Sequence, residues 1–230
     1  VGSEMCIRDR AKTKGLRLGG APITYMGEAQ QTAWRLIRQG RLGTVRVAYA
    51  EVNWGRIESW HPNPVPFYAV GPLFDVGVYP LTLLTAIFGP VRRVTGYGRT
   101  LYPDRKTQDG TPFHLDAADF SVALAEHASG TVTRLTTNFY VGHHTVQKGL
   151  EFHGDLASLY LHSWDRFNSQ VDVAPFGEAY APVELVRPPY DGIEWARGVA
   201  EMADAMADGR PHRATGAHAA HVVEILEAVK

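Results

Sequence analysis

The chain has 230 residues, of which 45% are hydrophobic and 20% are charged, and its formal net charge is −1. This length suffices for one large domain or for one domain with part of another. The near-zero charge gives no electrostatic basis for binding nucleic acid. The longest apolar run, residues 76–89, is too short to span a bilayer and contains Pro80, so we expect no membrane partner.

The first ten residues stand apart from the rest. The chain starts with Val1, and residues 1–10 have neither the apolar run of a signal peptide nor a periodic pattern. We therefore interpret residues 1–10 as a foreign leader and leave them out of the fold prediction. They include Cys6, the single cysteine, which rules out an intrachain disulfide. This cysteine usage is compatible with a cytoplasmic protein, which we take as the expectation.

Three elements are predicted between residues 15 and 54. Residues 15–22 predict a short strand, because apolar and polar side chains alternate. Residues 27–39 predict a helix, because apolar residues recur at helical spacing and Gly40 follows the last of them. Residues 44–54 predict a strand, because they alternate and are rich in β-branched side chains.

An aromatic, proline-rich loop is predicted at residues 57–70, followed by one apolar helix over residues 71–90. Near the start of this helix, Asp75 and Tyr79 lie four residues apart and so on one helical face. Pro80 predicts a distortion of this turn. Residue types alone favour Asp75 as a first-turn acid that complements the helix dipole.

The second half of the chain is predicted to be mostly β-structure. The predicted elements are a strand at 91–100, a loop at 101–114, a hairpin of 117–125 with 131–140, a pair of 150–153 with 158–162, weaker strands at 170–173 and 183–186, and helices at 194–207 and 216–229 with Thr215 as a cap. Consecutive strands joined by tight turns predict an antiparallel or mixed sheet.

The ten histidines invite a metal interpretation. Glu151, His153 and Asp155 alternate and would share one face of a strand, but Gly154-Asp155 is typical of a turn start. No spacing matches a compact metal motif, so we predict no metal site. Gly96-Tyr97-Gly98 lacks the third glycine of a phosphate loop and is interpreted as a bend.

Aromatic residues surround two polar ones near the predicted loop. Trp54, Trp60, Phe67 and Tyr68 flank His61 and Asn63. Aromatic faces beside polar groups suit a small polar ligand such as a sugar. A loop that packs down on its own aromatic side chains is an equally good interpretation of the residue types.

Four stretches go beyond generic chemistry: residues 15–27 with Gln31-Thr32, residues 60–68, residues 71–90 and residues 210–216. With them, the chain from Gly15 onward resembles the glucose–fructose oxidoreductase / inositol dehydrogenase / MocA (Gfo/Idh/MocA) family of NAD(P)-dependent oxidoreductases. The resemblance implies that residues 11–43 are a remnant of an NAD(P)-binding Rossmann domain. Residues 44–230 would then form the domain for substrate binding and oligomerisation. The resemblance implies that this domain is α/β (α+β), with a large open, mostly antiparallel or mixed sheet flanked by helices.

The resemblance also assigns roles to individual residues. The Asp-x-x-x-His pattern of the family is matched by Asp75, with Tyr79 in place of the histidine. This match favours a catalytic role for Asp75 over the first-turn interpretation, and it implies that Asp75 and Tyr79 are both catalytic. Because tyrosine ordinarily titrates near pH ~10, Tyr79 would donate a hydrogen bond or relay a proton, and Asp75 would orient or charge-balance a lysine.

Further candidates are tied to the same pocket. The substrate-binding candidates are Trp54, Trp60, His61, Asn63, Tyr68 and His144, and His144 is included because it follows a strand end. Pro22 and Thr24 match the family segment near the nicotinamide end of the cofactor, NAD or NADP. The family's glycine-rich dinucleotide loop and Glu-Lys-Pro segment are not found in this sequence, so we expect a fragment that is inactive by itself.

The functional prediction is the C-terminal part of a dehydrogenase that transfers hydride between nicotinamide and a sugar, polyol or similar hydroxy compound. The expected partners are a carbohydrate-like small molecule and further copies of the chain. The alternative is a non-catalytic binding or oligomerisation module that uses its open sheet. A metal-dependent sugar enzyme that uses the histidines is a third, weaker interpretation.

Overall fold

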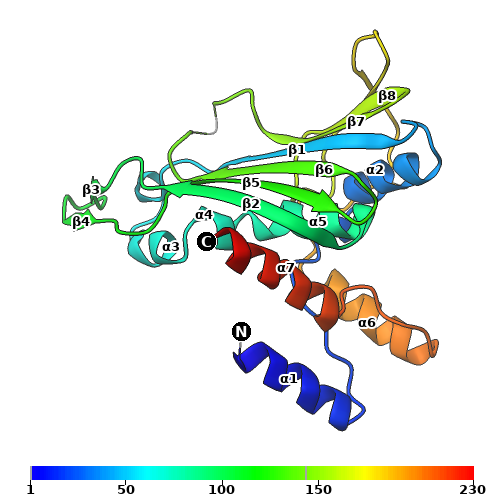
Figure 1. The fold of residues 1–230 in the computed structure, drawn as a ribbon, viewed down its shortest axis with the longest axis horizontal. Coiled ribbons are helices and arrows are strands. Elements are labelled where there is room, and N and C mark those ends of the chain that lie inside the picture. The colour runs from blue at the N-terminus through cyan, green and yellow to red at the C-terminus, as the bar shows by residue number, and fades with distance from the viewer. Residues whose placement is uncertain (1, 143) are drawn as a thin grey trace.

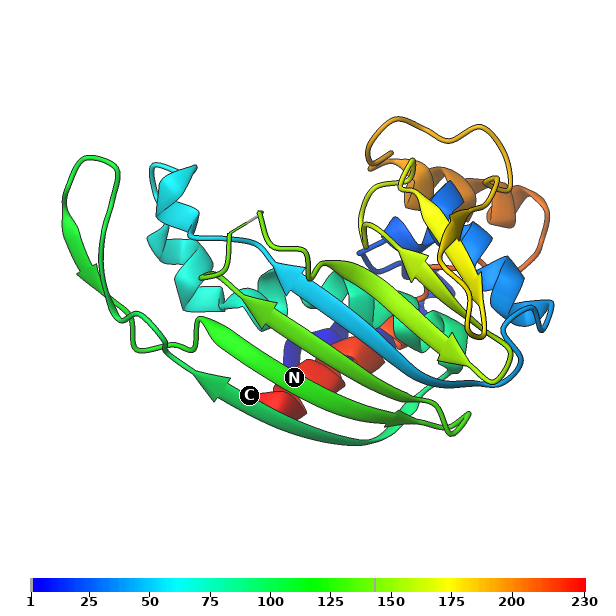
Figure 2. The same cartoon turned by 90° about the horizontal axis from the view of Figure 1, so that it is seen from above.

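The computed structural model describes residues 2–142 and 144–230, with the side chains of residues 2–6 left aside, and is organised around one curved sheet (Figures 1 and 2). The strand order is β10-β9-β8-β7-β1-β6-β5-β2. The strands are β1 (Val45–Asn53), β2 (Val91–Arg99), β5 (Phe120–His127), β6 (Val132–Asn138), β7 (Gly149–Gly154), β8 (Ala157–Leu161), β9 (Val171–Pro175) and β10 (Ala181–Pro182). The β1–β6 pair is parallel and the other neighbours are antiparallel, which confirms the predicted mixed sheet.

Helices lie on one side of this sheet. They are α1 (Gly2–Thr13), α2 (Glu28–Arg38), α3 (Val65–Val70), α4 (Pro72–Asp75), α5 (Val78–Phe88), α6 (Arg197–Ala207) and α7 (Gly216–Val229), with short 3₁₀ turns η1 (Thr24–Met26) and η2 (Ile57–Ser59). Helices α5 and α7 lie below the sheet in Figure 1 and behind it in Figure 2. Within the described residues, the opposite face carries no helix.

The core lies between the sheet and these helices. In β1, Ala48, Ala50 and Val52 are fully buried, whereas the alternate residues are partly exposed, as the twofold repeat of a strand requires. On the helical side, Leu83 and Leu84 of α5 are also fully buried. The predicted strand at residues 44–54 and the predicted helix at residues 27–39 are therefore confirmed as β1 and α2, with their ends moved by one residue.

The apolar helix predicted over residues 71–90 is wrong in its continuity, because the structure has two helices, α4 and α5, with a break at Val76 and Gly77. Pro80 has no N–H for the carbonyl of Val76, which interrupts the helical hydrogen-bond ladder. The backbone of Gly77 also passes very close to β6. A Cβ atom there would lie 2.5 Å from the Leu73 carbonyl oxygen and 2.9 Å from Cγ2 of Thr137.

Residues 15–22, predicted as a strand, form only an isolated bridge between Gly19 and Thr215. Their backbone bonds to the segment before α7, through Gly20 N to Ala214 O at 3.0 Å and Gly216 N to Leu18 O at 2.8 Å. This local pairing keeps them out of the sheet. Two of the stretches that carry the family resemblance, residues 15–27 and 210–216, therefore lie side by side.

Two predicted loops contain regular structure. Residues 57–70 hold η2 and α3, because a proline in the first turn of a helix loses no needed hydrogen bond. Residues 101–114 hold a small hairpin of β3 (Asp104–Lys106) and β4 (Pro112–His114), closed by Asp109-Gly110 with φ +89° at the glycine. The last strand, β10, covers residues 181–182 rather than 183–186, because Ala181 and Pro182 pair with β9.

The N-terminal segments have distinct environments. Residues 1–10, left out of the fold prediction, contribute from residue 2 onward to α1, which contacts α7. Helix α2 packs against β8 and β9, so the predicted Rossmann remnant is part of the same packed unit as the sheet. The division of the chain at residues 10 and 43 stays a prediction.

Candidate functional site

Asp75 and Tyr79 lie on either side of the break between α4 and α5. Asp75 ends α4, and Tyr79 lies in the first turn of α5. Both side chains are partly buried. The close approach of Gly77 to β6 fixes this break against the sheet, so both side chains are held by the packed core.

The Asp75 carboxylate has no hydrogen-bond or ion-pair partner among the residues that the structure describes. Burial alone raises the pKa of Asp75 above its ordinary value. Asp75 does not act as a helix cap either, because no side-chain bond caps α4 or α5. The interpretation of Asp75 as a structural first-turn acid therefore has no contact to support it.

Tyr79 belongs to an aromatic row that crosses from α5 to the sheet. Its ring centroid lies 5.1 Å from that of Trp164, which lies 5.5 Å from that of Trp54. Burial raises the pKa of Tyr79, and the charges of Asp75 and Asp165 raise it further. The phenol is therefore protonated at neutral pH and can donate a hydrogen bond.

The structure thus brings one predicted substrate residue, Trp54, into the neighbourhood of Tyr79. It also adds Trp164 and Asp165, which the sequence analysis missed. Both lie in the loop between β8 and β9, and nothing in their local sequence marks them. Trp54, Trp164 and Asp165 also line a small cavity of about 150 Å³ at the end of β1.

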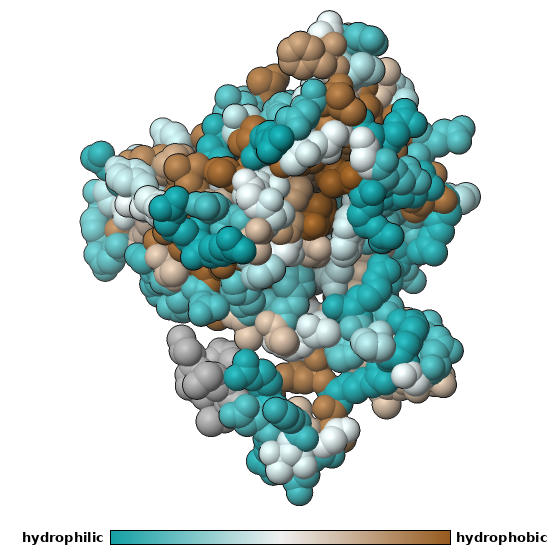
Figure 3. All heavy atoms as spheres, turned by 45° about the vertical axis from the view of Figure 1, so that its right-hand side comes forward, coloured by the Kyte–Doolittle hydropathy of each residue, from teal (hydrophilic) through white to brown (hydrophobic). Residues whose placement is uncertain are grey.

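Tyr79 also lines an apolar cleft of about 420 Å³ whose other wall is formed by residues 19–23 and α6. Pro22 lies in this cleft with Tyr79, as does Trp195, which is 66% exposed. The same wall includes Val199, which is 68% exposed, so this apolar part of α6 points outward. Figure 3 shows apolar side chains in a hollow on the side of the molecule that carries α2 and α6.

Thr24, the second predicted cofactor residue, is buried behind this wall. It is 1% exposed, and its hydroxyl has no hydrogen-bond partner within the described residues. The neighbouring Tyr25 hydroxyl is also buried without a partner, and burial raises the pKa of Tyr25 to about 12. Such unsatisfied groups are uncommon in a folded protein.

Trp60, His61 and Phe67 form a compact aromatic cluster within the predicted loop. The ring of His61 lies 4.8 Å from Phe67 and 5.5 Å from Trp60. Nδ1 of His61 lies 2.9 Å from the carbonyl oxygen of Asn63 and accepts from the Asn63 backbone N–H at 3.1 Å. These contacts are internal to the loop, so the candidates Trp60, His61 and Asn63 are held together. None of the contacts involves Asp75.

Tyr68 and His144 lie in contrasting surroundings. Tyr68 is 2% exposed and its hydroxyl donates to Glu58 and accepts from Arg105, so a substrate would reach it only by displacing those partners. His144 is exposed in the loop between β6 and β7 and lines neither of the two cavities that contain Tyr79 or Trp54.

The alternating Glu151, His153 and Asp155 do not converge. His153 lies 3.7 Å from Glu151, but Asp155 turns away to a two-pronged ion pair with Arg46. Across the described part of the chain, no group of three or more His, Cys, Asp or Glu side chains is arranged to hold a metal ion. No helix among the described residues is long and apolar enough to cross a membrane.

Comparisons with known proteins agree with this fold. The profile of the GFO/IDH/MocA C-terminal domain matches residues 30–160, a range that includes Asp75 and Tyr79. No curated protein sequence matches this chain significantly. An NAD binding oxidoreductase from Klebsiella pneumoniae superposes with a TM-score of 0.81 at 16% identity, covering 98% of this chain and 66% of that one.

Two further solved structures are sugar-related oxidoreductases. An aldose–aldose oxidoreductase from Caulobacter crescentus, complexed with glycerol, has a TM-score of 0.76 at 17% identity over 99% of this chain and 65% of its own. A UDP-N-acetylglucosamine 3-dehydrogenase from Acidithiobacillus ferrooxidans has a TM-score of 0.71 at 17% identity over 98% and 64%. At such identities the similarity establishes the fold, and this chain spans about two-thirds of these structures.

Proposed function

The chain belongs to the GFO/IDH/MocA family of oxidoreductases, and we propose that it is the C-terminal part of a nicotinamide-dependent dehydrogenase acting on a sugar, polyol or similar hydroxy compound. The observation that carries this proposal is the partly buried Asp75 carboxylate, which has no partner in the described chain and lies beside Tyr79. An unpaired carboxylate in such a place costs stability, and a role in binding or proton transfer accounts for its presence.

The two side chains have different parts in the proposed chemistry. When an alcohol is oxidised, the nicotinamide accepts the hydride and the protein must remove the proton. Tyr79 stays protonated at neutral pH, so it donates a hydrogen bond to the substrate oxygen or relays its proton. Asp75 binds a cationic group, such as the lysine expected from a nucleotide-binding domain, and balances its charge.

The residues of the cleft fit one end of a nicotinamide cofactor. The apolar walls beside Pro22 and Trp195 suit a planar ring, and the buried Thr24 hydroxyl offers an unused polar group close by in the sequence. No glycine-rich loop for the pyrophosphate occurs in the sequence. Pro22 would therefore contact only the nicotinamide end, with the buried Thr24 close to it in the chain, and the rest of NAD or NADP would bind elsewhere.

The substrate side of the proposed site has three contributors. Trp54 offers an aromatic face through the row that leads to Tyr79. The cluster of Trp60, His61 and Asn63 offers aromatic and polar groups on one loop. Two further residues are weaker candidates for the substrate side. His144 is exposed on another loop, and Tyr68 is buried.

We test this function by joining the chain to a nucleotide-binding domain and measuring cofactor reduction with aldoses, polyols and sugar acids. Turnover that falls at least about tenfold in Asp75→Asn supports the proposal, since that change removes a charge from the reacting site. Asp116→Asn is the matched control, because its side chain is fully exposed. Absence of cofactor binding to the joined protein, or equal turnover of the two variants, would contradict the enzyme assignment.

A second function, assembly with further copies of the chain, is favoured by the uncovered face of the sheet. Apolar residues are exposed on it, including Leu124 at 49% on β5 and Val132 at 41% on β6. We propose that this face pairs with a second copy. The pairing is compatible with catalysis and also with the alternative of a non-catalytic module, which would assemble yet never bind a nicotinamide cofactor.

A further inference from the structure

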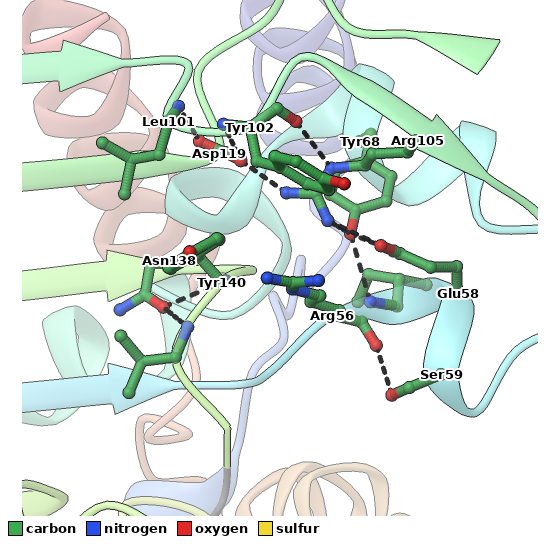
Figure 4. Close-up of polar contacts among 12 residues, drawn as sticks. Arg56, Glu58, Ser59, Tyr68, Leu101, Tyr102, Arg105, Asp119, Asn138 and Tyr140 are labelled. Atoms are coloured by element: carbon green, nitrogen blue, oxygen red, sulfur yellow. Dashed lines mark hydrogen bonds and ion pairs between the residues drawn. The ribbon is translucent and has the colours of Figure 1, made fainter. Parts of the chain in front are cut away.

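Arg56 lies just after β1, with its guanidinium against two tyrosine rings (Figure 4). Its Cζ atom lies 4.8 Å from the ring centroid of Tyr102 and 4.8 Å from that of Tyr140. The three residues come from three separate loops, so the tertiary fold alone assembles them. No carboxylate of the described chain pairs with this guanidinium.

The stacking leaves the hydrogen-bonding groups of the three side chains unused. The two ring centroids lie 6.3 Å apart, so the rings meet the guanidinium from one side and do not enclose it. No described residue accepts a hydrogen bond from its N–H donors. The hydroxyls of Tyr102 and Tyr140 have no hydrogen-bond partner among the described residues, and both side chains are partly exposed. The clamp, which we define as Arg56, Tyr102 and Tyr140, therefore combines one free cation with two free phenols.

A buried ion-pair network holds the clamp in place. The Arg105 side chain is fully buried and donates to Glu58 at 2.8 Å and to Asp119 at 2.5 Å. Arg105 also donates to the Tyr102 carbonyl at 2.9 Å, while Asp119 accepts from the Tyr102 backbone N–H at 3.3 Å. Burying such charges is expensive, and here it fixes the position of Tyr102.

Tyr140 is fixed independently. Its backbone N–H donates to the Asn138 side-chain oxygen at 3.1 Å, at the end of β6. The two rings are therefore positioned before any ligand arrives, which lowers the entropy cost of binding.

Arg56 and Tyr102 of the clamp line a cleft of about 710 Å³ between the β3–β4 hairpin and the loop that carries Ser59. Tyr140 lies against Arg56 and is not part of the lining. Its two carboxylates are already engaged, because Glu58 pairs with Arg105 and Asp104 pairs with His114 at 2.7 Å. Arg56 and Lys106 remain as the unpaired charges of the lining. The cleft thus offers positive charge together with hydroxyl groups.

We propose that this cleft binds an anionic polyol, a sugar-sized molecule that carries a carboxylate or a phosphate. The anionic group accepts in-plane hydrogen bonds from Arg56, with Lys106 adding charge. The polyol hydroxyls bond to the phenol of Tyr102. This site uses neither Asp75 nor Tyr79, so it stands whether or not the chain takes part in hydride transfer.

Calorimetric titration of the 230-residue chain tests the proposal with four probes: glucuronate, glucose 6-phosphate, glucose and inorganic phosphate. Ionic strength is held constant, because charge interactions are screened by salt. We expect glucuronate, glucose 6-phosphate or both to bind at least about tenfold more tightly than glucose, the size of a charge-assisted hydrogen bond. Preference for one of the two identifies the anionic group.

Three variants complete the experiment. Arg56→Gln should weaken binding of the preferred probe by roughly ten- to a hundredfold, and Arg56→Lys by less, because lysine keeps the charge without the planar fork. Arg92→Gln, an exposed arginine on β2, makes the same charge change and should leave binding unaltered. Three outcomes would each overturn the proposal. They are equal effects of Arg56→Gln and Arg92→Gln, equal binding of glucose and glucuronate, and binding of inorganic phosphate as tight as that of glucose 6-phosphate.

Discussion

Two aspartates of this protein lie in opposite surroundings. Asp119 is fully buried, but its carboxylate accepts hydrogen bonds from Arg105 and from the backbone of Leu101 and Tyr102. Asp75 is only partly buried and has no such partner in the described residues. A satisfied buried carboxylate specifies a fold, whereas an unsatisfied one is the kind of group that ligands and partners use.

Replacing Asp75 by asparagine should stabilise the isolated chain at neutral pH. Because the pKa of Asp75 is raised in the folded state, folding disfavours its charged form, and this penalty is complete at pH values above the folded pKa. We expect the Tm of Asp75→Asn to rise by about 2 °C at neutral pH and the gain to vanish near pH ~3, where both states are protonated. Differential scanning calorimetry measures both.

The control for this change is Asp116→Asn, whose parent side chain is fully exposed and should show no gain. A lower Tm for Asp75→Asn than for the unmodified chain would mean that the carboxylate has a stabilising structural role. That result would return Asp75 to the first-turn interpretation.

At the scale of elements, the break between α4 and α5 decides where Asp75 and Tyr79 lie. Sequence pattern predicts one helix, because residues 71–90 are apolar and bounded by glycine and proline. The break depends on how closely Gly77 approaches β6, and a contact between segments some sixty residues apart leaves no local pattern. Pro80 is a local sign of the distortion.

Gly77→Ala should destabilise the protein by about 1–3 kcal/mol, because the new methyl group would overlap the Leu73 carbonyl and Thr137. Urea unfolding monitored by tryptophan fluorescence gives this value. Gly98→Ala is the matched substitution, since its Cβ would meet Ala118 at 3.4 Å, an ordinary contact. Similar midpoints for the two variants would show that the break does not need a glycine.

Three histidines from α7 and β5 make hydrogen bonds near the end of α5. His218 of α7 bonds to Thr85 at 2.8 Å, His127 of β5 lies 2.9 Å from the Gly89 carbonyl, and His221 accepts from the Val91 backbone N–H. Burial lowers the pKa of His127 and of His218, and the charge of His221 lowers both further. These two rings are therefore neutral in the folded protein.

Stability should consequently fall as the solution is acidified. In the unfolded chain His127 and His218 bind protons near pH ~6.5, whereas in the folded chain they bind protons only at lower pH. The two neutral rings therefore contribute fully to the free energy of unfolding above that pH, and this contribution is lost below it. We expect the urea midpoint to drop between about pH 7.5 and pH 5.5, and His218→Gln to drop less. In the control variant His114→Gln, the fall of the urea midpoint with acidification should be unchanged or steeper, because Asp104 raises the pKa of the exposed His114. An unchanged fall of the midpoint in His218→Gln would contradict this account.

At the scale of the whole molecule, all the helices described lie on one side of the sheet (Figures 1 and 2). The other side carries the ion pair of Arg93 with Glu126 and exposed apolar residues such as Leu124. A second copy is the proposed cover for that side. Leu124→Asp should shift the chain toward monomer by at least about tenfold in dissociation constant, since it would bury a charge in the contact. Sedimentation velocity measures the distribution.

Met206→Asp is the corresponding change on the helical side, where Met206 of α6 is 58% exposed, and it should leave the association state unaltered. If Leu124→Asp associates as the unmodified chain does, the open sheet face is not the interface. If neither protein associates at all, the assembly proposal fails.

The sequence by itself determined the family, the mixed sheet flanked by helices, and most element positions, because strand alternation, helical spacing and capping act over a few residues. It placed Asp75 and Tyr79 as a pair and put Trp54 and Pro22 among the site candidates. It also identified Thr215 as the cap of α7, which accepts from the His218 backbone N–H.

Tertiary structure alone decided what depends on distant segments meeting. It split the apolar helix at Gly77, paired residues 15–22 with the segment before α7 instead of the sheet, and brought Trp164 and Asp165 to Tyr79. It buried Tyr68 against Arg105 and brought the rings of Tyr102 and Tyr140 into contact with Arg56. Such contacts join residues far apart in the chain, and their energies come from packing and desolvation that no local pattern records.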